Sequence, residues 1–278
     1  MGNSKELWDV KDLSTLTFWR AILGEALATF LFVFIVCSAI VPIHEVIGNG
    51  LKILQIAFTV GLAIATLVHC FGDVSGAHIN PAVTVAMLMT ARAGVFRALF
   101  YVAAQCSGAI GGAAVVYGLT PKDGRGNLGV TLVNDRLTEA QGFGMEFMLT
   151  FVLVFTVFAT VDPKRTLKGS PAIAIGLAVL IDHLIGITYT GASMNPARTL
   201  GPAVIMGIYD LFWVYWVGPL AGGVVAGWIY VLIFGRTLKS AASTKQEKEE
   251  TRDYSASTVV GVDNASFANT QTDFDTPL

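Results

Sequence analysis

Long apolar segments, separated by short links rich in polar residues and glycine, follow one another along most of this 278-residue chain. Six of them are long enough to cross the roughly 30 Å hydrocarbon layer of a bilayer as helices. Two shorter apolar runs, Pro81 to Thr90 and Pro196 to about Ile208, lie between long ones. The six long segments are Phe18 to Val41, Leu51 to Phe71, Ala98 to Tyr117, Gln141 to Val161, Ala172 to Tyr189 and Leu211 to Phe234.

Both short runs begin with the same tripeptide, which is Asn80-Pro81-Ala82 in the first and Asn195-Pro196-Ala197 in the second. Asn can cap the free amides of a helix start, and Pro at the first helical position needs no donor. The first run would be about 15 Å long as a helix, which is half the hydrocarbon layer. Each run therefore predicts a re-entrant half-helix, buried by protein because lipid cannot satisfy exposed backbone.

Composition agrees with a polytopic membrane protein. Hydrophobic residues make up 54% of the chain and charged residues 14%, and the mean hydropathy is +0.63. A soluble core needs less apolar material than this. The expected fold is all-α, with six transmembrane helices and two re-entrant half-helices. We expect a cytoplasmic N-terminal segment at 1–17, a channel domain at 18–235 and a disordered tail at 236–278.

The chain also contains an internal repeat. Ser75 to Thr84 and Thr190 to Thr199 match at six of ten positions, 115 residues apart. The repeats cover about 18–118 and 141–235, with three spans in each. An odd number of spans gives the two halves opposite topology, and inverted repeats with broken helices place their site at the bilayer midplane.

Basic residues indicate the orientation. Lys and Arg gather in the N-terminal segment, the link after the first half-helix, the link between the fourth and fifth spans, and the tail. Short basic links stay on the cytoplasmic side, so both termini are expected there, in a multi-pass protein of the plasma membrane. The tail is too polar to bury. It ends in Thr276-Pro277-Leu278, which fits a free strand that can pair with the edge of a PDZ domain.

The two Asn-Pro-Ala boxes, Arg198 directly after the second box, and Glu25 and Glu146 in the lead helices together resemble an aquaporin, a member of the major intrinsic protein family. The resemblance runs from about Phe18 to Phe234. It implies a passive water channel that excludes protons and ions and forms a homotetramer with one pore per subunit. It also implies that Glu25 and Glu146 hold the backbone of the half-helix loops.

The physical reading of the boxes explains such a pore. Asn80 and Asn195 can each donate an amide hydrogen to a water molecule at the pore centre. A water held by two donors cannot accept a proton along the file. The positive ends of the two half-helices raise the barrier for protons and cations further, as is known for aquaporin-type pores.

The resemblance also implies a selectivity filter of four residues, here Val60, His183, Ala192 and Arg198. His183 precedes Arg198 by the spacing that is typical of the family. Water-specific members usually carry Phe where this chain has Val60. Phe58 cannot substitute, because two residues along a helix turn the side chain by about 200°. We therefore expect a ring wider at one corner, which passes water and leaks urea, ammonia or hydrogen peroxide.

Two alternatives stay open. A glycerol- or urea-conducting channel is less favoured, because such channels carry Asp at Thr199 and a small residue at His183. A structural or adhesion protein of low permeability is the other alternative. His78 either lines the vestibule or packs the loop. No enzyme, cofactor, metal site or nucleic-acid partner is predicted, since the four histidines are scattered and no nucleophile signature is present.

Overall fold

The computed structural model describes residues 8, 10–42, 49–163 and 169–235; the tail and its PDZ-type end, for which disorder and binding were expected, lie outside these residues. All six expected spans and both half-helices are present. The long helices are α2 (Leu16–Ile40), α3 (Asn49–Ser75), α5 (Val95–Leu119), α6 (Glu139–Thr160), α7 (Pro171–Thr190) and α9 (Val214–Ile229). The half-helices are α4 (Pro81–Met89) and α8 (Pro196–Met206), and the short turns are η1 (Val10–Ser14), η2 (Lys122–Gly124) and η3 (Tyr230–Phe234).

The observed helices differ from the expected segments only at their ends. α3 continues to Ser75, beyond Phe71, because the helical backbone outlasts the apolar pattern. α9 begins at Val214 rather than Leu211, because hydrogen-bonded turns fill residues 209–213 first. The expected all-α fold is confirmed.

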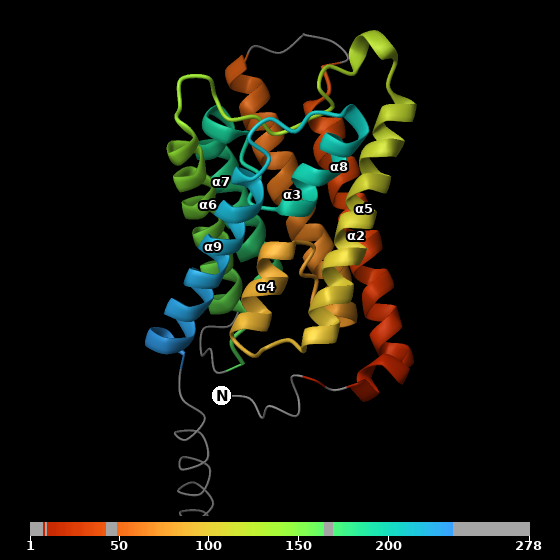
Figure 1. The fold of residues 1–278 in the computed structure, drawn as a ribbon, viewed down its shortest axis with the longest axis vertical. Coiled ribbons are helices and arrows are strands. Elements are labelled where there is room, and N and C mark those ends of the chain that lie inside the picture. Colours follow the sequence, from red (N-terminus) through yellow and green to blue (C-terminus); the bar gives the residue numbers. More distant parts are fainter. Residues whose placement is uncertain (1–7, 9, 43–48, 164–168, 236–278) are drawn as a thin grey trace, which may run out of the picture. The chain divides into compact units, whose positions relative to one another are not determined.

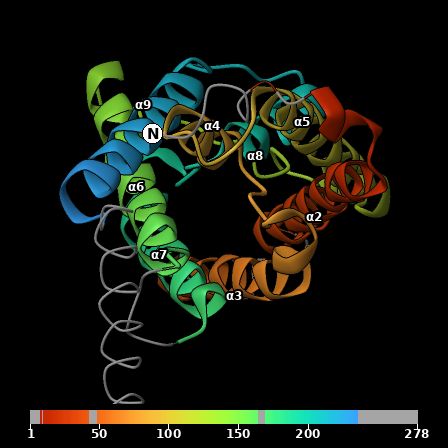
Figure 2. The same cartoon turned by 90° about the horizontal axis from the view of Figure 1, so that it is seen from below.

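The long helices form a ring, and the two half-helices lie on the side of it where α5 and α9 stand, as Figures 1 and 2 show. α4 occupies the lower half of the bundle in Figure 1 and packs on α5 and α9, whereas α8 occupies the upper half and packs mainly on α5. The N-terminal ends of α4 and α8 therefore face each other in the middle. This is the arrangement expected of two re-entrant segments that enter from opposite sides.

The bundle is built from two matching halves. α2 packs along α5 in the first half, α6 packs along α9 in the second, and α3 and α7 join the halves. Glycines allow the helices within each half to touch. A Cβ on Gly108 would overlap the carbonyl oxygen of Ala26, and one on Gly222 would overlap that of Phe147. Small residues let membrane helices approach in this way.

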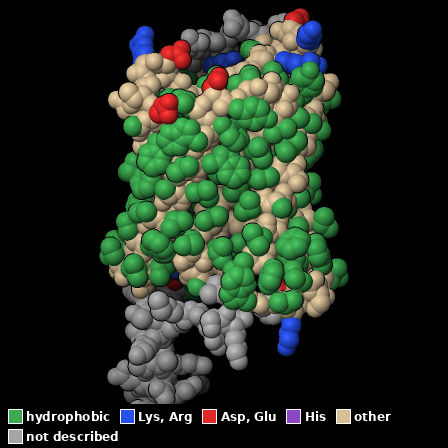
Figure 3. All heavy atoms as spheres, viewed as in Figure 1, with side chains coloured by type: hydrophobic (Ala, Val, Ile, Leu, Met, Phe, Trp, Pro, Cys, Tyr) green, Lys and Arg blue, Asp and Glu red, His purple; other side chains and the backbone are tan. Residues whose placement is uncertain are grey.

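The outer surface suits lipid. Figure 3 shows hydrophobic side chains covering the middle of the visible face, with charged side chains at its two ends. Six helices in the described residues are long and apolar enough to cross a membrane. Leucines on their outward sides, such as Leu27, Leu62 and Leu177, are more than half exposed. The chain is a multi-pass membrane protein.

Candidate functional site

The two Asn-Pro-Ala turns start their half-helices alike. Asn80 has an extended backbone, and its Oδ1 accepts a hydrogen bond from the amide of Ala82 at 2.8 Å. Asn195 accepts from the amides of Ala197 at 3.0 Å and Arg198 at 3.2 Å. Proline follows each Asn at the first helical position, where no amide hydrogen is needed. Each Asn therefore caps one half-helix with its oxygen and keeps its nitrogen for other partners.

The Asn nitrogens tie the two halves together at the centre. Asn80 Nδ2 donates to the carbonyl of Met194 at 2.8 Å, and Asn195 Nδ2 donates to the carbonyl of Ile79 at 2.9 Å. Each amide nitrogen carries two hydrogens, so one of them remains after this crossing bond. Both Asn side chains line the same central cavity. Two donors from opposite halves thus reach one level of the cavity.

A buried carboxylate from α2 holds the loop before the first half-helix. Glu25 Oε1 accepts from the Ser75 hydroxyl at 2.6 Å and the His78 amide at 2.9 Å. Oε2 accepts from the Ile79 amide at 2.7 Å and the Gln105 side chain at 2.8 Å. Four donors thus satisfy a charge that would otherwise be expensive at membrane depth.

Glu146 of α6 has the matching place in the second half. Its Oε1 accepts from the Thr190 hydroxyl at 2.6 Å and the Ser193 amide at 2.9 Å. Its Oε2 accepts from the Met194 amide at 2.7 Å. The two carboxylates bind equivalent amides of the two loops, and the second has one donor fewer.

These bonds hold both loops in an unusual backbone conformation. Ala77 and Ile79 have φ values of 48° and 57°, and Ala192 and Met194 have 52° and 54°. Residues with a Cβ seldom adopt the left-handed region, and each such residue costs about 1–2 kcal/mol. The surrounding hydrogen bonds must therefore hold the loops in place.

The loop conformation also exposes carbonyl groups. In a trans peptide the C=O points away from the N–H. With the amides of His78 and Ile79 turned to Glu25, the carbonyls of Ala77 and His78 point the other way, and both residues line the cavity. Carbonyl oxygens are thus available along one side of the cavity as acceptors.

The cavity itself has a volume of about 200 Å³ and runs between the halves. Much of its wall is apolar, with Ile64 and Val68 of α3 facing Ile175 and Val179 of α7. Polar atoms come from the loops, the two Asn side chains, His78 and His183. A file of water in such a space meets few partners besides the aligned carbonyls and amides.

Of the four expected filter residues, His183 lines this cavity, whereas Val60, Ala192 and Arg198 are buried outside its lining. Val60 lies one turn before the cavity-lining Ile64, on the same side of α3. Phe58, in contrast, is 51% exposed on the outer surface, and Val60 is 0% exposed. Phe58 does not replace Val60, as its position in the sequence predicts.

His183 is fixed through one ring nitrogen. Its Nδ1 lies 2.8 Å from the carbonyl of Val179, which can only accept, so Nδ1 carries the hydrogen. In a neutral ring Nε2 is then an acceptor. His78 combines the two roles left open by the sequence, because it lines the cavity and also packs on Tyr101 and bonds Thr84.

Arg198 is tethered by the loop between α5 and α6. Its Nη1 donates to the carbonyl of Gly129 at 2.6 Å, while Nε has no partner within the described residues. Leu128 and Gly129 have φ values of 56° and 77°, which turns this carbonyl toward the guanidinium. The guanidinium group is therefore held in one orientation, and its Nε–H is left without an acceptor among the described residues.

Three hydroxyl groups fasten the same loop to α8. Thr199 Oγ1 lies 2.8 Å from Thr131 Oγ1 and 2.6 Å from Ser193 Oγ. All three side chains are buried. Thr199 thus joins the start of α8, the pore loop and the loop that carries Gly129.

Several supporting residues were not predicted from the sequence. Gln105 stands out as a polar side chain in an apolar span, which is a usable signal. Tyr101 and Tyr215 bond the carbonyls of Ser75 and Thr190, at 2.6 Å and 2.8 Å. Gly129, Thr131 and the loop geometry gave no signal, because nothing local shows what a distant carbonyl faces. No cluster of three metal-ligating side chains occurs in the described part of the chain.

Comparison with known proteins agrees with this geometry. Aquaporin-4 of Bos taurus is 48% identical over 228 residues, which is 81% of this chain and 70% of that protein. Aquaporin-5 of Homo sapiens is 46% identical over 231 residues, or 82% of this chain and 86% of that protein. The X-ray structure of the aquaglyceroporin from Plasmodium falciparum superimposes with a TM-score of 0.72 at 26% identity, covering 78% of this chain and 97% of that chain.

The family described as "Major intrinsic protein" matches residues 12–230. This range contains every helix from α2 to α9 and leaves out only the end of η3 and the start of η1. Together with two facing half-helices capped by Asn80 and Asn195, it confirms the resemblance drawn from the sequence: the chain belongs to the major intrinsic protein family.

Proposed function

We propose that the chain is a passive water channel that excludes protons and ions. One observation carries the proposal. Asn80 and Asn195 each donate one amide hydrogen to a carbonyl of the other half, and each has a second amide hydrogen left for a water molecule in the cavity that both line. A water molecule there receives hydrogen bonds from both halves and has no lone pair free for a proton from its neighbour. The similarity to aquaporin-4 and aquaporin-5 supports the same function.

Exclusion of ions follows from charge. The N-termini of α4 and α8 meet at the centre, and each carries about half a positive charge. Arg198 adds a full positive charge in the second half. Protons and cations therefore meet a repulsive barrier, and the apolar cavity wall offers no compensation for a lost hydration shell.

For the filter we propose Val60, His183, Ala192 and Arg198. The short side chains of Val60 and Ala192 leave more room than a phenyl ring would. Water passes such a ring, and small neutral solutes such as urea, ammonia or hydrogen peroxide pass more slowly. His183 lines the cavity, and its Nε2 supplies an acceptor to the permeant.

Glycerol conduction is the competing function, and the similarity to the Plasmodium falciparum aquaglyceroporin gives it a specific basis. Thr199 argues against it. It is 1% exposed and shares hydrogen bonds with two other hydroxyls, at the position where the family resemblance implies Asp in glycerol-conducting channels. An adhesion role with little permeability is the other competitor.

We further propose that both termini lie in the cytoplasm, that the protein resides in the plasma membrane, and that four copies assemble. The apolar outer sides of α2, α3, α6 and α7 support assembly or lipid contact. A PDZ-type partner at the C-terminal Thr276-Pro277-Leu278 remains a proposal from the sequence.

The test is a set of permeability measurements on one proteoliposome preparation. Stopped-flow light scattering gives the rates for water, urea and glycerol in parallel. We expect fast water, slow urea and glycerol near the rate of empty vesicles. Glycerol as fast as urea would favour the competing channel, and water no faster than in empty vesicles would favour the adhesion role.

A further inference from the structure

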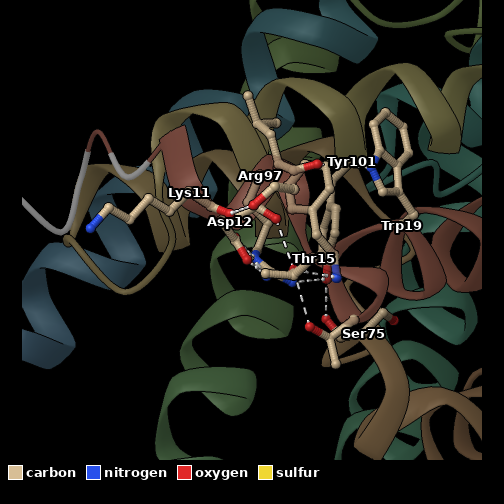
Figure 4. A network of polar contacts seen from close by, with 11 residues as sticks. Lys11, Asp12, Thr15, Trp19, Ser75, Arg97 and Tyr101 are labelled. Atoms are coloured by element: carbon tan, nitrogen blue, oxygen red, sulfur yellow. Dashed lines mark hydrogen bonds and ion pairs between the residues drawn. The ribbon is translucent and has the colours of Figure 1, made fainter.

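A chain of polar contacts leads from the N-terminal turn η1 to the loop before the first half-helix (Figure 4). It begins with an ion pair between Asp12 of η1 and Arg97 of α5. Arg97 Nη2 lies 2.7 Å from Asp12 Oδ2 and 3.0 Å from Oδ1, and Nε lies 3.2 Å from Oδ2. Two guanidinium nitrogens thus bind one carboxylate in a bidentate ion pair, which fixes the plane of the guanidinium.

The remaining nitrogen of Arg97 continues the chain. Nη1 donates to the Tyr101 hydroxyl at 3.3 Å, and that hydroxyl donates to the carbonyl of Ser75 at 2.6 Å. Tyr101 is completely buried. A cationic donor on the oxygen polarises the O–H bond, so the hydroxyl is a stronger donor toward Ser75.

Ser75 is the last residue of α3 and the first support of the pore loop. Its hydroxyl donates to Glu25 and accepts from the amide of Ala77 at 3.0 Å. His78 and Asn80 lie three and five residues farther along the same loop. The loop has a strained backbone at Ala77, so a shift of the Ser75 peptide would be passed to the residues that line the cavity.

The turn η1 is itself held in place. The Thr15 amide and hydroxyl both donate to the carbonyl of Asp12, at 3.0 Å and 2.8 Å. Trp19 Nε1 donates to the carbonyl of Leu13 at 2.9 Å. Asp12 is therefore presented to Arg97 by a fixed backbone rather than by a free tail.

The second half has a tyrosine equivalent to Tyr101 but no arginine equivalent to Arg97. Tyr215 donates to the carbonyl of Thr190 at 2.8 Å, as Tyr101 does to that of Ser75. Four residues before Tyr215 stands Leu211, whereas four residues before Tyr101 stands Arg97. The charged connection is thus specific to the first loop.

We propose that Asp12 and Arg97 are positioning residues of the pore, which act through Tyr101 and Ser75 to hold loop 76–80 in its conducting conformation. The N-terminal turn is then a working part of the channel. Only the expected effect of Asp12 and Arg97 on permeation rests on the proposed water channel. Their expected effect on the backbone of loop 76–80 does not depend on it.

Hydrogen exchange of the full-length protein in lipid nanodiscs, followed by mass spectrometry, tests the loop directly. In Asp12→Asn we expect peptides covering His78 and Ile79 to exchange about two- to tenfold faster, which is the effect of weakening one hydrogen bond. Peptides covering Ser193 and Met194 should not change. Tyr101→Phe should act on the first loop alone, and Tyr215→Phe on the second alone.

The matched control is Asp123→Asn, which removes an exposed carboxylate from η2 and should leave both loops as they are. Arg97→Lys keeps the charge but offers one nitrogen for the contacts that three guanidinium nitrogens make, so the first loop should exchange at an intermediate rate. Water permeability per channel should fall in the same order as loop protection.

The proposal is overturned if Asp12→Asn and Arg97→Lys leave loop 76–80 at the wild-type rate. It is also overturned if both loops loosen alike, because that indicates general destabilisation. If wild-type vesicles pass water no faster than empty ones, the proposed function fails, and the exchange rates still decide the role of Asp12.

Discussion

The two loops that lead into α4 and α8 share one plan and differ in what surrounds it. In each, a buried glutamate binds two backbone amides, a tyrosine bonds the carbonyl at the end of the preceding helix, and an Asn caps the half-helix. The first loop adds Gln105 and the charged chain to η1. The second adds Arg198 and a cluster of hydroxyls.

This difference separates two tasks. The shared parts build the centre, where both Asn side chains meet. The parts found only in the second half hold Arg198, a residue of the proposed filter, against Gly129. The parts found only in the first half fasten the loop to the N-terminal turn. The second half thus holds the proposed filter residue Arg198 in place, and the first half is fastened to the N-terminal turn.

The largest expected effect comes from removing the shared carboxylates. Glu25→Ala leaves four donors without their acceptor and Glu146→Ala leaves three. Each buried donor without a partner costs about 1–3 kcal/mol, so both variants should lose most of their stability and permeability. Thermal unfolding in detergent and water flux in vesicles check this. Wild-type behaviour of either variant would contradict the shared plan.

The next effect concerns selection. Val83 stands in the first half where Arg198 stands in the second, so Arg198→Val makes the second half like the first. Removing the charge and its bulk should raise urea permeability about tenfold or more while water flux continues. Light scattering in vesicles measures both. The matched control is Val83→Ala, which shortens the equivalent side chain of the first half. It should leave the ratio of urea permeability to water permeability unchanged. If Val83→Ala changes this ratio as Arg198→Val does, Arg198 has no special role in selection.

Val60 tests the open corner of the filter. Val60→Phe should lower urea permeability about fivefold, equivalent to about 1 kcal/mol in the barrier, with water flux nearly unchanged. Val68→Phe, two turns farther along the same side of α3, is the matched control and should slow water as well, because Val68 lines the central cavity. An unaltered urea rate in Val60→Phe would remove Val60 from the filter.

The smallest effect concerns the fourth donor on Glu25. Gln105→Leu removes the fourth donor and leaves Glu25 with three, the number that Glu146 has. One lost hydrogen bond is worth about 1 kcal/mol, so Tm should fall by about 2–4 °C. The double variant Gln105→Leu with Asp12→Asn should lose more than either change alone. A Tm equal to that of the wild type would show that three hydrogen-bond donors stabilise the buried glutamate as well as four do.

The sequence allowed the helices and half-helices to be predicted because their signals are local. An Asn-Pro step caps a helix wherever it occurs, and a run of twenty apolar residues suits a bilayer. Glu25 and Glu146 could be singled out because a carboxylate in an apolar span needs partners. The ends of α3 and α9 were less accurate, because apolar content does not mark where hydrogen-bonded backbone stops.

The supporting contacts could not be predicted in the same way. Gly129 reaches Arg198 across 69 residues, and Asp12 reaches Arg97 across 85. Such contacts depend on loop paths and helix rotation, which leave no periodic trace in a single sequence. The roles of Tyr101 and Tyr215 could have been predicted from the sequence, because the two residues lie in the matching last spans of the two halves.

The central claim is that water crosses this protein between Asn80 and Asn195 while protons do not. It is tested most directly by measuring osmotic water flux and proton flux on the same proteoliposomes, with a pH-sensitive dye inside. Water flux should be well above that of empty vesicles, and proton flux should equal theirs. Proton flux that rises together with water flux, or no added water flux, would contradict it.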